Sequence, residues 1–148
     1  YTILVGDANG VDKAVQNYCN DKGYRKINVF ATNGNARNNI GNWNVIEVKV
    51  DHNIKGFDYY AAKDIAMSKE ADYGFMIWNG KSKGTLNNII NLLLLDKKVL
   101  VYFTPEKKFH TLNSINELKI LINKTDDKTT YDFYTRKLKD HAQLILPL

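Results

Sequence analysis

Short apolar runs alternate with segments of helical period along this chain, and that alternation limits its fold more than any other feature. Residues 73–78 and 99–103 are continuous apolar runs of the kind that form buried strands. Between them, residues 85–95 carry apolar side chains at the spacing of a helix. Strands separated by helices imply βαβ units, so we predict an α/β fold with a mostly parallel sheet and helices on both faces.

The rest of the chain follows the same alternation. Residues 32–44 are expected to form a loop, because they include two glycines and six asparagines. Further strands are expected at residues 1–5, 27–30, 45–50 and 144–146. Further helices are expected from residue 11 to a stop at Gly23, and at residues 57–70, 112–122 and 131–141.

The length of 148 residues fits one domain with its own hydrophobic core. We therefore expect residues 1–148 to form a single domain, with residues 105–148 as a helical extension. The chain opens at Tyr1 on a strand-like run without a Met, so we expect some N-terminal residues of the protein to be missing. A hydrophobic content of 44% and a charged content of 25% are typical of globular proteins, and they exclude a disordered or low-complexity protein.

The sequence gives no sign of a membrane span, a disulfide framework or a metal site. The longest apolar run, Ile89–Leu95, is far shorter than the ~20 residues that a span needs. Cys19 stands alone, and the three histidines lack the spacing of metal ligands. Because no signal peptide is visible, we expect a cytoplasmic protein. Because Cys19 and the histidines have no ligand spacing, we expect no metal, and we expect no cofactor. The net charge of +5 is spread along the chain, which favours a solvated surface over a nucleic-acid interface.

The first glycine-rich loop, residues 6–12, joins the strand at 1–5 to the following helix. Glycines let the backbone turn sharply, and the free amides at the start of a helix attract anions. Alternatively, Asp12 satisfies those amides itself, and the segment is only a capped turn. Asp7 is the best candidate for a carboxylate that contacts a ligand, through a sugar hydroxyl or a base rather than a phosphate.

The second glycine-rich loop, residues 78–85, joins a buried strand to the helix at 85–95. Ser82 and Thr85 offer hydroxyl groups, two lysines offer positive charge, and Gly84 permits close approach of the backbone. This set suits a phosphate or a ribose phosphate, although the residue order is not that of a Walker loop. A solvated loop with a plain turn is the alternative. Ligands of parallel sheets bind beyond the carboxyl ends of the strands, where both glycine-rich loops are expected.

Three other side chains are candidates for a role near these loops. Trp78 stands at the mouth of the second loop, where its ring is placed to stack on a base. Arg37 lies in the loop at 32–44 and either contacts an anion or a base, or belongs to an asparagine-rich surface loop. Lys63, beside Asp64, is expected either in the wall of a pocket or on a solvated helix face.

The two loops, together with Lys63–Met67 and Ala71–Asp72, resemble the SLOG superfamily of Rossmann-like domains, which includes DprA, the LOG phosphoribohydrolases and YspA-type proteins. The likeness is greatest to the YspA-type branch, with its Gly-x-Ala-x-Gly-x-Asp and Trp-x-Gly-x-Ser-x-Gly-Thr patterns, and covers roughly residues 3–103. It implies a Rossmann-like sheet and a pocket, shared by both loops, for a nucleotide or a nucleotide-derived ligand. Such folds commonly pair through helices, so a homo-oligomer is plausible.

One departure from the resemblance concerns catalysis. LOG hydrolases and nucleoside deoxyribosyltransferases carry a carboxylate just after the Gly-Thr of the second loop, where it supports cleavage of a glycosidic bond. Here Asn87 and Asn88 occupy those positions, and an amide supplies neither negative charge nor an effective nucleophile. We therefore expect binding rather than catalysis; if a reaction is catalysed, Asp7 is the best candidate residue.

The leading prediction is a domain that senses or binds a nucleotide-derived small molecule. Two alternatives stay open: an enzyme that hydrolyses the N-glycosidic bond of a nucleotide, and a DprA-like binder of single-stranded DNA. The candidate ligand-binding residues are Gly6, Asp7, Ala8, Asn9, Gly10, Asp12, Lys63, Trp78, Gly80, Ser82, Gly84 and Thr85.

Overall fold

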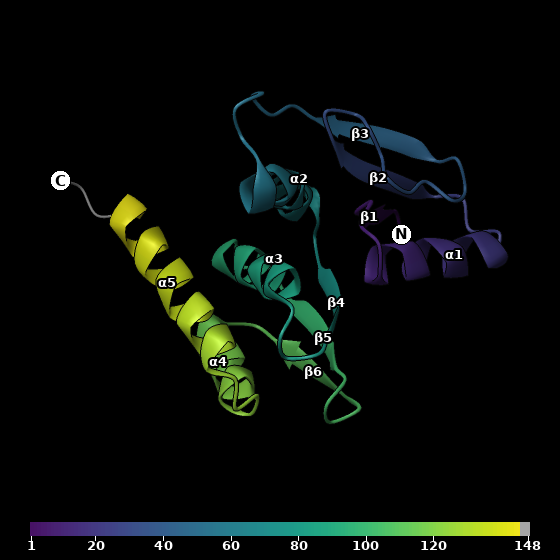
Figure 1. The fold of residues 1–148 in the computed structure, drawn as a ribbon. Coiled ribbons are helices and arrows are strands. Elements are labelled where there is room, and N and C mark those ends of the chain that lie inside the picture. The colour runs from purple at the N-terminus through teal and green to yellow at the C-terminus, as the bar shows by residue number, and fades with distance from the viewer. Residues whose placement is uncertain (146–148) are drawn as a thin grey trace. The chain divides into compact units, whose positions relative to one another are not determined.

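The computed structural model describes residues 1–145 and has an α/β fold with five helices and two small, mostly parallel sheets (Figure 1). This confirms the predicted α/β class and is consistent with a Rossmann-like arrangement. The strands are β1 (Ile3–Val5), β2 (Ile27–Thr32), β3 (Asn44–Val48), β4 (Gly74–Trp78), β5 (Val99–Phe103) and β6 (Lys108–Leu112). The helices are α1 (Val11–Asp21), α2 (Gly56–Glu70), α3 (Lys83–Leu94), α4 (Ile115–Asn123) and α5 (Lys128–Ile145).

The chain divides into two units, residues 1–71 and residues 72–148, called here the N-terminal and C-terminal units. Each unit holds one three-stranded sheet, in the order β1-β2-β3 and β4-β5-β6 respectively. None of the helices within residues 1–145 is both long and apolar enough to cross a bilayer.

In the N-terminal unit, β2 is the central strand and pairs in parallel with both neighbours. Five of its six residues are buried, as expected for a parallel strand covered on both faces. Ile27 and Val29 share a hydrophobic cluster with Cys19 of α1. Side chains alternate along a strand, and on the other face Thr32 donates a hydrogen bond to the carbonyl of Tyr59 in α2, at 3.1 Å. Helices therefore cover both faces of this sheet.

In the C-terminal unit, β4 and β5 are parallel, whereas β6 returns antiparallel to β5. Side chains alternate between the two faces of each strand, and one face buries Trp78, Val99, Val101 and Phe103. Helix α3 packs against β4 and β5. Side chains on the opposite face of this sheet are apolar but exposed: Phe75, Leu100 and Phe109 are 54%, 38% and 62% exposed. The prediction of helices on both faces thus describes the β1-β2-β3 sheet better than the β4-β5-β6 sheet.

Three predicted elements differ from the structure. Residues 108–112 form β6, so the helix predicted at 112–122 begins only at Ile115, after a Ser114 cap. The predicted strand at 144–146 is wrong for Leu144 and Ile145, which end α5; residue 146 lies outside the described residues. The strand predicted at 45–50 ends at Val48, where the chain turns away from β2.

The start of α4 shows why that helix begins where it does. The hydroxyl of Ser114 accepts a hydrogen bond from the amide of Glu117, at 3.3 Å. The Glu117 carboxylate reaches back to accept the amide of Asn113, at 2.6 Å. Two amides that have no acceptor within the helix are thereby satisfied, in the manner of a capping box.

We expect Ser114→Ala to lower the free energy of unfolding by about 1 kcal/mol, because it removes the cap of α4. Urea unfolding of the full chain, followed by circular dichroism, measures this loss. Ser114→Asn is the matched control, since asparagine caps helices as well as serine does. Equal losses for both variants would mean that the hydroxyl does not cap α4.

Candidate functional site

The first glycine-rich loop, between β1 and α1, places the carboxylate of Asp7 inside the N-terminal unit. The Asp7 residue is only 3% exposed. Arg37 binds both of its carboxylate oxygens, with Nη2 2.9 Å from Oδ1 and Nε 3.3 Å from Oδ2. The backbone amide of Arg37 donates a further hydrogen bond to Oδ2 at 3.0 Å. The loop between β2 and β3 is thereby joined to the loop after β1.

Lys63 lies on α2 and is also buried, at 3% exposed. Its ammonium nitrogen is 2.6 Å from Oδ1 of Asp64 and 3.9 Å from Oδ1 of Asp7. Of the two predicted positions for Lys63, a solvated helix face is therefore wrong. Asp7, Asp12, Arg37, Lys63 and Asp64 together form a group called here the charge cluster.

Asp12 completes the charge cluster from the first turn of α1. Its Oδ2 accepts the amide of Ala8, at 3.1 Å. A Cβ at position 6 would lie 2.3 Å from this oxygen and 3.0 Å from the ammonium nitrogen of Lys63. Gly6 is thus required because two charged groups pass directly over its backbone.

The pKa values of the two carboxyl groups in this loop, Asp7 and Asp12, are shifted in opposite directions. Burial raises the pKa of Asp7, but the hydrogen bonds and the charge of Arg37, with the charge of Lys63, outweigh burial and leave that pKa below its usual value. Burial also raises the pKa of Asp12, and there Lys63 and the amide of Ala8 compensate only in part. Asp7 is therefore held ionised, whereas the charged form of Asp12 is disfavoured by folding.

These contacts change the expected part of Asp7 in ligand binding. Both of its oxygens are engaged within the N-terminal unit, and the amide of Ala8 is already taken by Asp12. The exposed residues of this loop are Asn9, Gly10 and Val11. Gly10 precedes α1 at φ +89°, and no side chain caps the helix there. The first-turn amides of α1 are consequently without a side-chain cap.

Two residues near this loop have contacts that the sequence did not indicate. The guanidinium of Arg37 lies 4.4 Å from the centre of the Tyr60 ring, so its stacking partner is a protein side chain. Gln16, which is fully buried, donates to the carbonyl of Gly6 at 2.9 Å and accepts the amide of Ile40 at 3.0 Å. The spacing of Gln16 four residues after Asp12 was the available signal, since it places both on one helix face.

Trp78 opens the second glycine-rich loop but does not face a ligand. It is fully buried, its indole nitrogen donates to the carbonyl of Ser82 at 3.1 Å, and its ring packs 5.7 Å from that of Phe103. A ring that stacks on a base needs an exposed face, so the predicted stacking by Trp78 is wrong for this structure. Trp78 ends β4, and successive side chains of a strand point to opposite faces of the sheet. Trp78 points to the face that is covered, which explains its burial.

Neutral side chains hold the rest of the second loop. Oδ1 of Asn79 accepts the amides of Lys81 and Ser82, at 3.0 and 2.9 Å. Ser82 is the N-cap of α3, and its hydroxyl oxygen accepts both the amide and the hydroxyl of Thr85, at 3.4 and 3.0 Å. Asn79 and Ser82 thus satisfy amides of this loop without any carboxylate.

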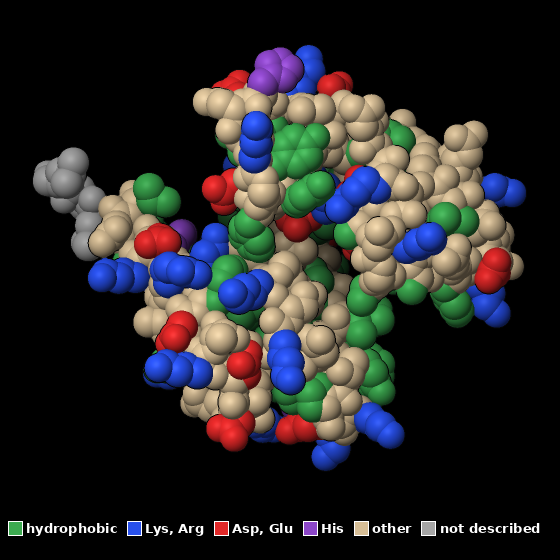
Figure 2. Space-filling model, viewed as in Figure 1, with side chains coloured by type: hydrophobic (Ala, Val, Ile, Leu, Met, Phe, Trp, Pro, Cys, Tyr) green, Lys and Arg blue, Asp and Glu red, His purple; other side chains and the backbone are tan. Residues whose placement is uncertain are grey.

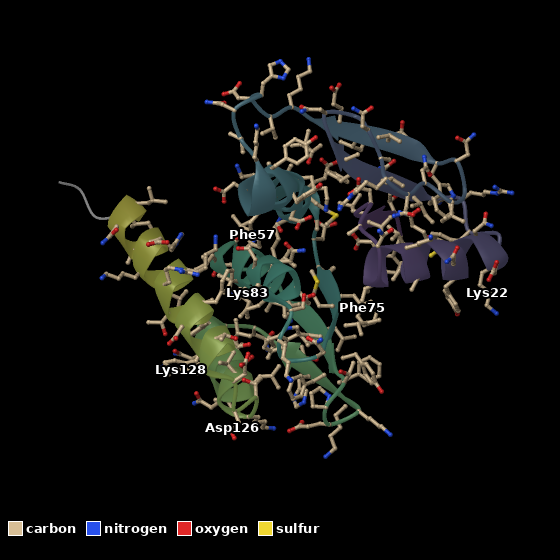
Figure 3. The ribbon with its side chains drawn as sticks, viewed as in Figure 1. Lys22, Phe57, Phe75, Lys83, Asp126 and Lys128 are labelled. Atoms are coloured by element: carbon tan, nitrogen blue, oxygen red, sulfur yellow. The ribbon has the colours of Figure 1, made fainter. Side chains whose placement is uncertain are left out.

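The start of α3 is open and positively charged. The amides of Lys83 and Gly84, in its first turn, have no acceptor within the helix. A Cβ placed on Gly84 would meet no atom within 4 Å, so the backbone there is accessible. Lys81 and Lys83 are exposed beside it, and Figure 3 labels Lys83 at this helix start.

The asparagines at the positions of the expected carboxylates lie one turn further along α3. Asn87 is 1% exposed, and Oδ1 has no hydrogen-bond partner among the described residues; the same holds for Oδ1 of Asn88. Within residues 1–145, no three His, Cys, Asp or Glu side chains are grouped in a way that could hold a metal ion. The prediction that the two glycine-rich loops share one pocket stays a prediction, because they belong to different units.

The chain matches no protein-family model, no curated protein and no solved structure.

The same substitution, aspartate to asparagine, can be compared at positions 7 and 12 of the charge cluster. We expect Asp7→Asn to lower the free energy of unfolding by about 3 kcal/mol at pH 7, because it leaves Arg37 and Lys63 without their shared carboxylate. Asp12→Asn should lower the free energy of unfolding by less than about 1 kcal/mol, since the asparagine oxygen still accepts the Ala8 amide and the buried charge is removed. Urea unfolding of both variants tests the order.

The pH dependence of these variants separates charge from packing. A lowered folded pKa means that the stabilisation by Asp7 is full above its unfolded value of 3.8 and is lost as the pH falls through the folded value. The difference between the unmodified chain and Asp7→Asn should therefore shrink below pH 3.8. For Asp12, whose pKa is raised, stability falls as the pH rises towards the folded value. A larger loss for Asp12→Asn than for Asp7→Asn would contradict this account.

Proposed function

We propose that this protein binds a nucleotide or a nucleotide-derived small molecule, and that the start of α3 receives its phosphate. The supporting observation is the open, basic helix start described above. The accessible backbone of Gly84, the first-turn amides and two exposed lysines lie within one short segment. Amides at a helix start attract anions through their N–H groups and the helix dipole.

The charge of this segment supports an anionic ligand. No Asp or Glu occurs from Asn79 to Leu95, whereas Lys81 and Lys83 flank the helix start. Ser82 caps α3 with a hydroxyl rather than a carboxylate, so the N-terminal dipole is not neutralised by a side-chain charge. The first loop differs, because Asp12 supplies a carboxylate to the amide of Ala8. A phosphate is therefore better accommodated by the second loop than by the first.

The first loop has an exposed part of its own. Asn9 and Gly10 stand before a helix start that no side chain caps. Asp7 supports them indirectly, because Asn38 donates to its carbonyl at 2.8 Å and to Oδ1 of Asn9 at 3.0 Å. The contacts of Asp7 and Asn38 thus shape the loop and leave Asn9 and Gly10 exposed.

The two alternative functions have weaker support. Cleavage of an N-glycosidic bond needs a carboxylate near the sugar, and both oxygens of Asp7 are already bound by Arg37. Binding of single-stranded DNA needs a basic track along the backbone of the strand. On the face shown in Figure 2, Lys and Arg side chains are scattered among Asp and Glu instead of forming such a track.

Calorimetry of the full chain with ADP, pyrophosphate and adenosine tests the proposal. We expect ADP and pyrophosphate to bind, and adenosine to bind more weakly because it has no phosphate. Gly84→Val should weaken ADP binding at least about tenfold, which corresponds to about 1.4 kcal/mol, because its branched side chain covers the helix start. The fold should tolerate this variant, since a Cβ at position 84 meets open space.

Charge is tested by replacing Lys81 and Lys83 together with glutamine. Affinity for ADP should fall, and its dependence on salt should become shallower, because fewer exposed charges are screened. Lys139→Gln, an exposed position on α5, is the matched control and should leave both unchanged. Absence of binding by all three ligands, or unchanged binding by Gly84→Val, would contradict the proposal.

A further inference from the structure

The connection between α4 and α5 reaches the second glycine-rich loop. Thr130, in the first turn of α5, is 1% exposed and lies 50 positions from Gly80 in the sequence. Its hydroxyl oxygen is 2.8 Å from the carbonyl oxygen of Gly80, in a buried hydrogen bond. Figure 3 labels Asp126 on this connection, Lys128 at the start of α5 and Lys83 at the start of α3. The C-terminal helices thus contact the proposed phosphate loop through a specific polar bond.

The hydroxyl of Thr130 lies between two acceptors, the carbonyl of Gly80 and the carboxylate of Asp127. Oδ2 of Asp127 is 2.5 Å from the same hydroxyl, which has only one proton to donate. Asp127 has other donors, because it accepts the amide of Thr130 at 3.2 Å and the hydroxyl of Thr129 at 2.9 Å. The hydroxyl therefore bridges Asp127 and Gly80, and removing it takes this donor away from the buried Gly80 carbonyl, which is costly.

Gly80 is also confined by shape. Its φ of +79° is a conformation that favours glycine. A Cβ at this position would lie 3.1 Å from Cγ2 of Thr125 and 3.2 Å from the ring of Phe103. The α4–α5 connection and β5 therefore enclose Gly80, and the hydrogen bond from Thr130 orients its peptide group.

The orientation of this peptide group matters for the residues that follow it. The amides of Lys81 and Ser82 point at Oδ1 of Asn79, and the amides of Lys83 and Gly84 have no acceptor within the helix. We propose that Thr130 is a positioning residue for this loop, acting through the carbonyl of Gly80 to hold the start of α3 in its anion-binding form. The inference rests on the proposed function, and it assigns the extension at residues 105–148 a part in ligand binding.

Thr130→Val tests the inference, because valine has nearly the shape of threonine but no hydroxyl. Hydrogen exchange at the amides of residues 80–85 should become at least about tenfold faster, and affinity for ADP should fall about five- to tenfold. Thr130→Ser keeps the hydroxyl and should restore both towards the values of the unmodified chain. Such rescue by serine would not occur if the side chain acted through its volume alone.

Two further variants serve as controls. Thr129→Val removes a hydroxyl that donates to the Asp127 carboxylate and not to the loop, so exchange in residues 80–85 should be unchanged. Ser114→Ala destabilises α4 without touching the loop, so it shows what a general loss of stability does to exchange and affinity. If Thr130→Val behaves like Ser114→Ala, Thr130 is merely structural and the inference fails.

The design separates this inference from the proposed function. If the unmodified chain binds neither ADP nor pyrophosphate, the proposed function fails, and the role of Thr130 in binding fails with it. If the unmodified chain binds ADP but Thr130→Val binds equally well, only the inference fails. Loss of affinity and faster loop exchange in Thr130→Val, with recovery in Thr130→Ser, support both.

Discussion

The buried carboxylate of Asp7 is the constraint on which the N-terminal unit depends, because a charge removed from water needs close partners of opposite sign. Arg37 and Lys63 meet that need from the β2–β3 loop and from α2. Asp12 and Asp64 in turn surround Lys63, so four segments converge on one point. The long asparagine-rich loop is therefore held by the charge of Arg37 as well as by the apolar packing of Trp43.

In the C-terminal unit, too, a strand passes through a glycine-rich loop into a helix, but neutral groups make the hydrogen bonds of this loop. Asn79 and Ser82 satisfy loop amides with amide and hydroxyl oxygens, and Thr130 serves the Gly80 carbonyl. The consequence is chemical. A loop closed by carboxylates repels anions, whereas a loop closed by neutral oxygens keeps the positive end of its helix available.

The sequence predicted the strongly apolar elements well, because β4, β5 and α3 are continuous or periodic in apolar residues. It missed β6, since Lys108–Leu112 is mostly polar and follows β5 after only a short turn. The strand-to-helix position of both glycine-rich loops was also predictable. Their partners were not: Arg37 and Thr130 lie 30 and 50 positions from Asp7 and Gly80, and local spacing says nothing of which distant side chains meet.

The hydrogen bond from the indole of Trp78 to the Ser82 carbonyl has a practical consequence. Indole emission responds to the polarity around the ring, so a loosened second loop would admit water and shift the fluorescence of Trp78 to longer wavelengths. The chain has one other tryptophan, Trp43, which lies in the N-terminal unit. With Trp43 replaced by phenylalanine, the intrinsic fluorescence of the protein becomes a direct optical reporter of the segment between β4 and α3.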